Sequence, residues 1–365
     1  MSTHSGPRAA GGQPSFSLFF FSDDRERSKE ASYHLVLEAA KFADAEGFDS
    51  IWVPERHFNK FGALYPNPSV LAAGISTVTE NVGIRAGSVV VPLHHPVRVA
   101  EEWAMVDNLS RGRVGIAAAS GWSPGDTFLS DADFGRRREE TFERVDTVRR
   151  LWRGERADVR TPRARREDGE EEVLRTTYPR PVQPELPTWI ATVGTRETWV
   201  RAGECGHHIL TALVATTLDD IADHVRAYRA ARAGNGHAPD AGRVTMMIHT
   251  FLGPSDAEVR ATVHEPLVQY IETHINQAGG HQDAPDAAGK RNLAEFAFER
   301  YYTRNGLFGT PETALPVVDR LLAAGVDEIA CLIDFGVEDE AVLQGLPYIS
   351  MLRKATLERH GGGRR

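Results

Sequence analysis

The sequence predicts an α/β fold, a (β/α)8 TIM barrel, from three observations. Short runs that are apolar throughout alternate with segments whose apolar residues recur at helical spacing. Runs of this kind are typical of parallel strands that are buried on both faces. Eight of them occur along the 365 residues, and nearly all are followed by a helical segment. Eight βα units make a TIM barrel, and a doubly wound open sheet is the alternative.

The predicted strands and helices follow from these runs in order. The strands are FSLFFFS (16–22), DSIWVP (49–54), VGIRAGSVVVP (82–92), GRVGIAAAS (112–120), PTWIAT (187–192), HHILTAL (207–213), RVTMMIHTFLG (243–253) and VDEIACLIDF (326–335). The helices are 30–48, 68–79, 96–110, 135–153, a segment from about 196, 217–232 and 338–355. Gly47 is placed to end the first helix, and Pro96 to begin the third. One apolar stripe marks the first helix, at Val36, Ala39, Ala40 and Ala43.

We expect one barrel domain over 15–357, with a disordered leader at 1–14 and a disordered tail at 358–365. Residues 155–186 interrupt the alternation, because they are charged and rich in arginine and proline. An Asp-Gly pair inside this stretch is a hairpin signal. It predicts a small excursion of two short strands, or a mobile loop.

A second interruption, residues 254–310, is a long insertion between the seventh and eighth units. It contains a helical piece near 264–275 and a piece rich in glycine, aspartate and alanine at 276–290. We expect the second piece to be disordered when the site is empty. Long insertions of this kind are often functional, and a lid over the active site is the expected role.

The composition excludes several classes of function. A net charge of -9 argues against binding to nucleic acid or to an anionic membrane surface. No apolar run approaches the roughly 20 residues of a membrane span, and the N-terminus lacks the apolar core of a signal peptide. The two cysteines, Cys205 and Cys331, form no disulfide framework, and both are interpreted as small buried residues. Together these features favour a cytoplasmic protein.

The first candidate site follows the second predicted strand, in the sequence PERHF. In a TIM barrel, functional residues lie at the C-terminal ends of the strands. Glu55, Arg56 and His57 come directly after an apolar run, so they are expected on that face. An imidazole titrates near neutrality and moves protons, whereas a guanidinium keeps its charge and binds anions. The alternative is a surface salt bridge, with His57 merely filling a gap.

Two further strand ends favour a cofactor that carries a phosphate and an aromatic ring. After the fifth strand, Gly194 and Thr195 precede a helix, and Thr198 lies one turn in. Backbone N–H groups at a helix N-terminus with two hydroxyls suit a phosphate, although an ordinary threonine N-cap explains the same pattern. After the fourth strand stands the tripeptide of Ser120, Gly121 and Trp122, in which the indole is suited to flank a ring.

Other common motifs are absent from the sequence. It has no GxGxxG after a strand, no GxxxxGK[ST] and no HExxH. The pairs His94–His95 and His207–His208 stand at strand–helix junctions without a partner at metal-ligand spacing, so we interpret them as structural. We therefore expect no metal site.

The sequence resembles a known family. The segment PERHF, followed by NPSVLAAGISTVTENVGIRAGSVVVPLHHPVRVAEEWAMVDNLSRGRVGIAAASGW, is similar to the bacterial luciferase-like flavin-dependent monooxygenases. The most specific part runs from HHPVRVAEE through DNLSRGR to SGW, and the resemblance extends over roughly 16–355. More narrowly, the chain looks like the members found in natural-product gene clusters, which act with nonribosomal peptide and polyketide assembly lines.

The resemblance implies a (β/α)8 barrel that receives reduced FMN from a separate flavin reductase, forms a flavin hydroperoxide with O₂ and is usually a homodimer. It places Thr195 and Thr198 on the phosphate, with Gly194 contributing its backbone. The residues on the phosphate and ribityl side are then Ser120, Gly121 and Trp122. Family members often have a non-prolyl cis peptide under the flavin ring, at the position of Gly87 and Ser88.

Glu55 and His57 also fall on family positions, but luciferase has histidine where this chain has Arg56. Light emission from a long-chain aldehyde is therefore not expected. We assign His57 to proton transfer, Arg56 to anion stabilisation and Glu55 to orienting both. The expected reaction is oxygenation of a secondary-metabolite intermediate, either a free small molecule or a carrier-protein-tethered one. The alternatives are a deazaflavin-dependent hydride-transfer oxidoreductase and a non-catalytic flavin-binding protein of an assembly line.

Overall fold

Eight parallel strands close into a barrel, as the sequence predicts. The computed structural model describes residues 13–21, 33–58, 64–121, 124–130, 133–158, 174–213, 216–278 and 287–361. The barrel strands are β1 (Ser15–Phe19), β2 (Ser50–Val53), β3 (Gly83–Val90), β4 (Val114–Ala119), β7 (Thr188–Ala191), β8 (His208–Ala212), β9 (Val244–Leu252) and β11 (Glu328–Leu332). They pair in the order β9-β11-β1-β2-β3-β4-β7-β8, and a further pairing of β8 with β9 closes the ring.

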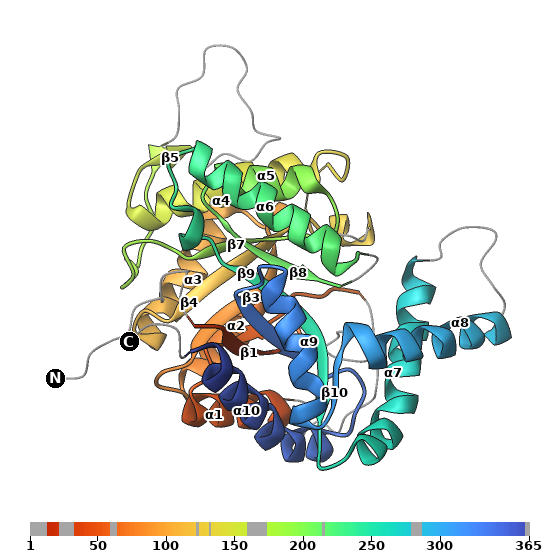
Figure 1. The fold of residues 1–365 in the computed structure, drawn as a ribbon. Helices are drawn as coiled ribbons and strands as arrows, with labels where there is room; N and C mark the ends of the chain where they lie inside the picture. Colours follow the sequence, from red (N-terminus) through yellow and green to blue (C-terminus); the bar gives the residue numbers. More distant parts are fainter. Residues whose placement is uncertain are drawn as a thin grey trace.

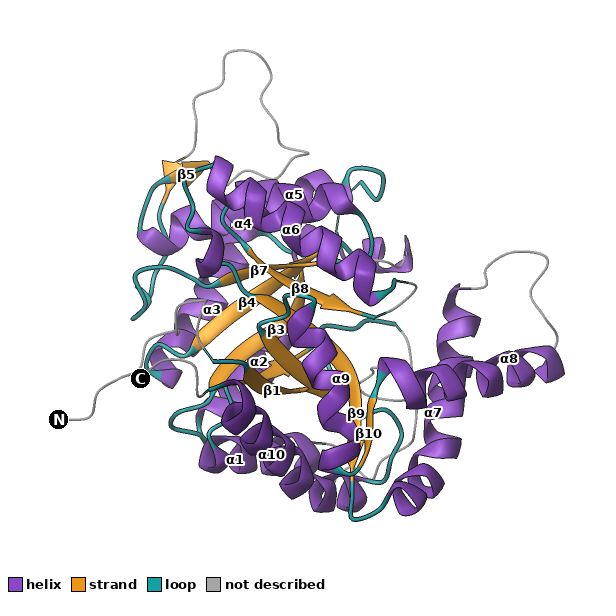
Figure 2. Ribbon diagram, viewed as in Figure 1, coloured by secondary structure: helices purple, strands orange, loops and turns teal. Residues whose placement is uncertain are grey.

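Helices surround the barrel, as Figures 1 and 2 show. They are α1 (His34–Glu46), α2 (Pro68–Ser76), α3 (Pro96–Ser110), α4 (Arg137–Arg153), α5 (Arg196–Glu204), α6 (Leu218–Gly234), α9 (Pro311–Ala323) and α10 (Asp339–His360). Short 3-10 helices cover Val91–Leu93, Pro124–Leu129 and Pro239–Ala241. Gly47 ends α1 with a left-handed φ of 72°, and Pro96 begins α3, so both helix signals are confirmed. None of the helices that the structure describes is long and apolar enough to span a membrane.

The insertion between β9 and β11 is more helical than the sequence indicated. It contains α7 (Asp256–Ala278), α8 (Ala287–Arg300), a π-helical turn (Tyr301–Asn305) and β10 (Leu307–Gly309). In Figure 1, α7 and α8 lie to one side of the barrel. The helix expected near 264–275 begins earlier and ends later, and residues 287–290 of the piece expected to be disordered belong to α8. The rest of that piece, 279–286, lies outside the described residues.

The order of two parts of the insertion, α8 and β10, has a physical basis. Ala294 and Phe298 are buried, so α8 has an apolar face that packs rather than the polar character expected of a linker. The three residues of β10 pair in parallel with the end of β9. They form a strand too short to stand out as an apolar run.

The stretch 155–186 contains the expected pair of short strands, β5 (Ala157–Asp158) and β6 (Leu174–Arg175), which are antiparallel. The Asp-Gly turn between them lies outside the described residues. Helix α10 reaches three residues into the predicted tail, because Asp319 holds Arg359 at 2.5 Å and His360 at 2.7 Å.

The prediction for the two cysteines is only half right. Cys331 is buried in β11, but Cys205 is exposed. Cys205 stands at the C-terminal end of α5, outside the apolar face of that helix.

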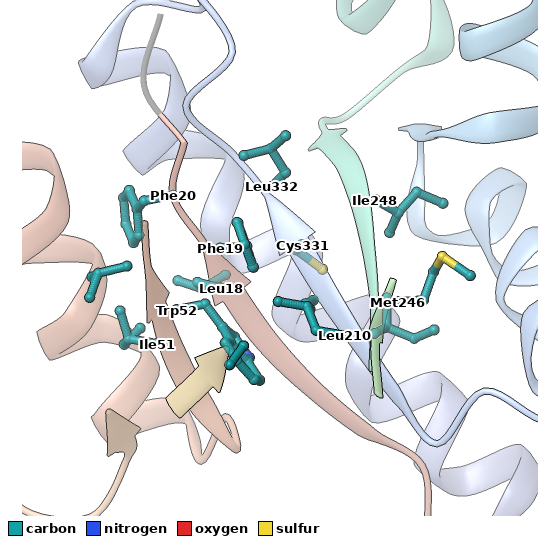
Figure 3. Packing of buried hydrophobic residues seen from close by; sticks show 14 of the residues in the cluster. Leu18, Phe19, Phe20, Ile51, Trp52, Leu210, Met246, Ile248, Cys331 and Leu332 are labelled. Carbon is teal, nitrogen blue, oxygen red and sulfur yellow. The ribbon is translucent and has the colours of Figure 1, made fainter. Parts of the chain in front are cut away.

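The barrel interior combines large apolar side chains with one buried charge network. Phe19 and Trp52 stack with their ring centroids 6.1 Å apart, and Figure 3 shows them among the side chains of neighbouring strands. Below them, the fully buried Glu328 carboxylate accepts hydrogen bonds from Trp52 Nε1 at 3.0 Å and from Arg85 Nη1 at 2.9 Å. Burial alone would raise the pKa of Glu328, but Arg85, Arg243 and these hydrogen bonds lower it to about 2. A charge this deep is tolerated because it is paired and hydrogen-bonded.

Candidate active site

A cavity of about 650 Å³ opens at the C-terminal ends of the strands. Its volume lies within the range of small-molecule and cofactor sites. The predicted site residues that line it are Glu55, Arg56, His57, Gly87, Ser88, Ser120, Gly121, Gly194, Thr195 and Thr198. Trp122 lies outside the described residues. Residues that follow β2, β4 and β7, together with Gly87 and Ser88 of β3, thus line one cavity.

The Glu55 carboxylate is the centre of one wall. It is buried and accepts hydrogen bonds from Nε2 of His57 at 2.7 Å and Nε2 of His94 at 2.6 Å, both on Oε1. Its second oxygen accepts the backbone N–H of Val90 at 2.8 Å. Burial alone would raise the pKa of Glu55, but these hydrogen bonds outweigh it and lower the pKa to about 2. Glu55 is therefore a carboxylate throughout the physiological pH range.

Arg56 belongs to the same loop and also lines the cavity. Its backbone N–H donates to the carbonyl of Tyr65 at 2.9 Å, which fixes the chain just past β2. Its guanidinium lies 4.6 Å from the centroid of the Phe21 ring and is only 7% exposed. Burial lowers the pKa of Arg56, and Tyr270 and Asp126 act in the opposite direction. A surface salt bridge, the alternative for this trio, does not describe side chains as buried as Glu55 and Arg56.

The floor of the cavity carries the backbone feature that the family resemblance implies. The peptide bond between Gly87 and Ser88 is cis. A Cβ added at Gly87 would lie 2.7 Å from the Phe19 ring and 3.0 Å from Trp52. Only glycine fits between these two rings at this position.

The turn after β7, the fifth strand of the barrel, differs from an ordinary N-cap. Thr195 is the N-cap residue of α5, yet its side chain makes no capping hydrogen bond within the described helix. Its Oγ1 lies 2.8 Å from Oγ1 of Thr198 instead. A Cβ added at Gly194 would meet no described atom within 4 Å, so the turn borders open space. The N–H groups at this helix end are accessible to a ligand with negative charge.

The turn after β4, the fourth strand, leads to α4, whose first residues are basic and line the cavity. Gly121 has a left-handed φ of 77°, which favours glycine, and its carbonyl accepts Nε of Arg137 at 3.3 Å. Arg137 and Arg138 begin α4, and both line the cavity. Guanidinium groups that line the same cavity as Thr195 suit a phosphate.

Several residues of this site were not predicted from the sequence. They are His94, Asp126, Arg137, Arg138 and Thr211. Asp126 lines the cavity, and its burial raises the pKa of its carboxyl group, an effect opposed by His57 and Arg56. Thr211 is buried on β8 and its Oγ1 has no hydrogen-bond partner among the described residues. Asp126 follows SGW in the sequence, so the end of the fourth strand did carry a signal for it.

The interpretation of His94 as lacking a partner needs correction, whereas that of His207 and His208 agrees with the structure. His94 meets Glu55 through the fold, across 39 positions of sequence. His207 bonds Thr188 at 2.8 Å, and burial lowers its pKa to about 3. The half-buried His208 accepts the N–H of Arg243 at 3.0 Å.

Glu55, His57 and His94 place ligand atoms within 4.8 Å of one another, as a metal site does. The contacts of 2.6 Å and 2.7 Å fit hydrogen bonds better. Ligand atoms about 2.1 Å from one ion and at right angles are roughly 3 Å apart. We therefore interpret the cluster as hydrogen-bonded.

Comparison with known proteins identifies the family. A family model described as luciferase-like monooxygenase matches residues 15–328. The chain belongs to this family. As a luciferase-like monooxygenase, it is an oxidoreductase.

Two relatives of the luciferase-like chain have named activities. It is 25% identical to the oxygenase component of the flavin-dependent trigonelline monooxygenase of Acinetobacter baylyi, over 94% of this chain and 92% of that protein. It is 26% identical to limonene 1,2-monooxygenase of Rhodococcus erythropolis, over 79% of this chain and 71% of that protein.

Solved structures share the fold of the luciferase-like chain. A monooxygenase from Streptomyces bottropensis has a TM-score of 0.75 at 21% identity, with 93% of this chain and 99% of that one covered. The oxygenating constituent of 3,6-diketocamphane monooxygenase from Pseudomonas putida, in complex with FMN, has a TM-score of 0.74 at 20% identity, with 94% and 98% covered. An F420-dependent secondary alcohol dehydrogenase has a TM-score of 0.71 at 16% identity, with 94% and 99% covered.

Proposed function

We propose that the protein is a flavin-dependent monooxygenase that uses reduced FMN and O₂ to oxygenate a secondary-metabolite intermediate. The observation that carries the proposal is that one cavity is lined both by Gly194, Thr195 and Thr198, at a helix start suited to an anion, and by the polar trio of Glu55, Arg56 and His57. The relatives support it, because the trigonelline enzyme is flavin-dependent and the diketocamphane structure contains FMN.

The described residues fit FMN. Its phosphate would lie at Gly194, Thr195 and Thr198, where the two hydroxyls and the start of α5 meet open space. Ser120 and Gly121 would line the phosphate and ribityl side, with Arg137 and Arg138 adding positive charge. The flavin ring would lie over the cis peptide at Gly87 and Ser88.

Bound reduced flavin would supply the electrons that activate O₂. The chain's own residues control the proton that such chemistry requires. His57 is held by Glu55 through Nε2, and its imidazole is the group that we assign to proton exchange. Arg56, whose guanidinium lies over the Phe21 ring, stabilises a developing anion at the cavity wall. Glu55 orients His57 and stays ionised while it does so.

The partners are proposed from the relatives and from the family resemblance. The trigonelline relative is named as an oxygenase component, which supports a separate flavin reductase as the source of reduced FMN. We propose a homodimer in the cytoplasm, and a substrate that is a small molecule, free or tethered to a carrier protein of an assembly line. The insertion 254–310 is proposed to shield the cavity from water, because Tyr270 of α7 already acts on Arg56.

Deazaflavin-dependent hydride transfer is the second candidate, because the fold is shared with an F420-dependent dehydrogenase. A consumption assay separates the candidates. Purified protein with reduced FMN should consume O₂ and form an oxygenated product from its substrate. Reduction of deazaflavin without O₂ uptake would favour the second candidate, and neither activity would indicate a non-catalytic flavin-binding protein.

A further inference from the structure

We propose that His94 is a positioning residue that shares the Glu55 carboxylate with His57, so that protonation of one ring opposes protonation of the other. The inference rests on the proposed function, in which His57 moves the proton. It adds a second imidazole, located between β3 and α3, to the proton-transfer group, which the sequence alone placed only in PERHF.

The geometry is unusual in that one oxygen serves two rings. Oε1 of Glu55 lies 2.7 Å from Nε2 of His57 and 2.6 Å from Nε2 of His94. A carboxylate only accepts, so each ring donates from Nε2. The N–H of Val90 occupies the other oxygen at 2.8 Å, which holds the carboxylate in place between the rings.

One carboxylate balances one positive charge, so the two imidazoles titrate as a coupled pair. If both rings were protonated, two cations would share Glu55, and the guanidinium of Arg56 lines the same cavity as Glu55 and His57. The first ring to gain a proton therefore opposes protonation of the second.

The surroundings of His94 favour its charged form. Burial lowers the pKa of His94, but the hydrogen bond and charge of Glu55, with Glu102 behind it, raise the pKa overall, against the opposing charge of Arg144. The groups that face the pair are thus Glu55, Glu102, Arg144, Arg56 and, from the 3-10 helix after β4, Asp126. A charged His94 would therefore oppose protonation of His57 across the shared carboxylate.

A structural role for His94 predicts something different. The backbone of His94 already ties the loop, since its N–H donates to Val91 at 3.1 Å and its carbonyl accepts Arg144 at 2.8 Å. Glutamine at this position retains an N–H donor for Glu55 but carries no charge. His94→Gln therefore preserves the hydrogen bond and removes only the electrostatic coupling.

The test is a pH titration of the histidine rings by NMR in the flavin-free protein. Assignment uses His57→Gln and His94→Gln. We expect the His57 ring in His94→Gln to titrate about one pH unit higher than in the wild type, because its charged neighbour is gone. His95→Gln is the matched control, since His95 caps α3 through the N–H of Val97 and should leave His57 unchanged.

An unchanged titration of His57 in His94→Gln would overturn the proposal. Addition of one equivalent of Zn²⁺ gives a second test: we expect no binding, and tight binding that perturbs both rings would show a metal site instead. Because the protein carries no flavin in either measurement, the result is independent of turnover. A coupled titration together with full activity of His57→Ala would keep the coupling and reject the proposed catalytic role.

Discussion

Oγ1 of Thr195 lies 2.8 Å from Oγ1 of Thr198, at the first turn of α5. The two hydroxyls face each other at the edge of the cavity instead of bonding the helix backbone. An N-cap threonine normally accepts a backbone N–H, so the side chain of Thr195 is used for something other than starting the helix. A phosphate would be held by both hydroxyls and by the helix N–H groups.

Replacement of both threonines by alanine should weaken FMN binding at least tenfold. Hydrogen bonds to a charged group contribute roughly 1.5–3 kcal/mol each, and the double variant leaves neither hydroxyl unpaired. The dissociation constant is measured by equilibrium titration of FMN. Thr217→Ala is the control, because Thr217 caps α6 through Asp220 and is exposed away from the cavity. An unchanged constant in the double variant would place the phosphate elsewhere.

His57→Ala should bind FMN within a few fold of the wild type but form product about a hundredfold more slowly. Without the proton-transferring imidazole, O₂ should be released as hydrogen peroxide instead of entering product. The measurement is oxygenated product and hydrogen peroxide per O₂ consumed. If His57→Ala turned over at the wild-type rate while Arg56→Ala were inactive, the two roles would be wrongly assigned.

Glu328→Ala should destabilise the barrel by up to about 3–5 kcal/mol, because Nη1 of the buried Arg85 loses its carboxylate partner while Nη2 keeps Asp49. Chemical denaturation measures the free energy of unfolding. Glu299→Ala is the matched control, since Glu299 pairs with Arg260 on the surface and should cost no more than about 1 kcal/mol. Equal losses from the two variants would show that the buried network does not stabilise the fold.

The same carboxylate gives an expected pH dependence. The pKa of Glu328 is lowered from 4.5 to about 2, so its contribution to stability is present above pH 4.5 and is lost as the pH falls toward 2. In denaturation series at pH 6 and below, Glu328→Gln should therefore lose less stability on acidification than the wild type. Parallel pH profiles for the two proteins would contradict this origin of acid sensitivity.

The barrel could be predicted from the sequence because its strands are buried on both faces. Runs such as VGIRAGSVVVP and RVTMMIHTFLG are apolar without alternation, which distinguishes them from exposed strands. β10 has only three residues, and its partner β9 is supplied by the fold. The exposure of Cys205 depends on which side of α5 faces solvent at its last turn, which hydropathy alone does not determine.

The cavity was predictable where strand ends carry polar residues, and less so elsewhere. Glu55, Thr195 and Ser120 each follow an apolar run, and the rule that barrel sites lie at strand ends locates them. His94 follows a 3-10 turn beyond β3, and only the folded chain brings it to Glu55. Arg137 and Arg138 begin a helix after the fourth turn, where a charged pair usually faces solvent.

The most direct test of the account is which reduced flavin the purified protein binds under anaerobic conditions. Reduced FMN and reduced deazaflavin are titrated separately into the wild type and into the Thr195→Ala, Thr198→Ala double variant. The account predicts that the wild type binds reduced FMN, that the double variant binds it at least tenfold more weakly, and that admission of O₂ leads to its consumption. Binding of reduced deazaflavin alone, with no reaction with O₂, would contradict the account.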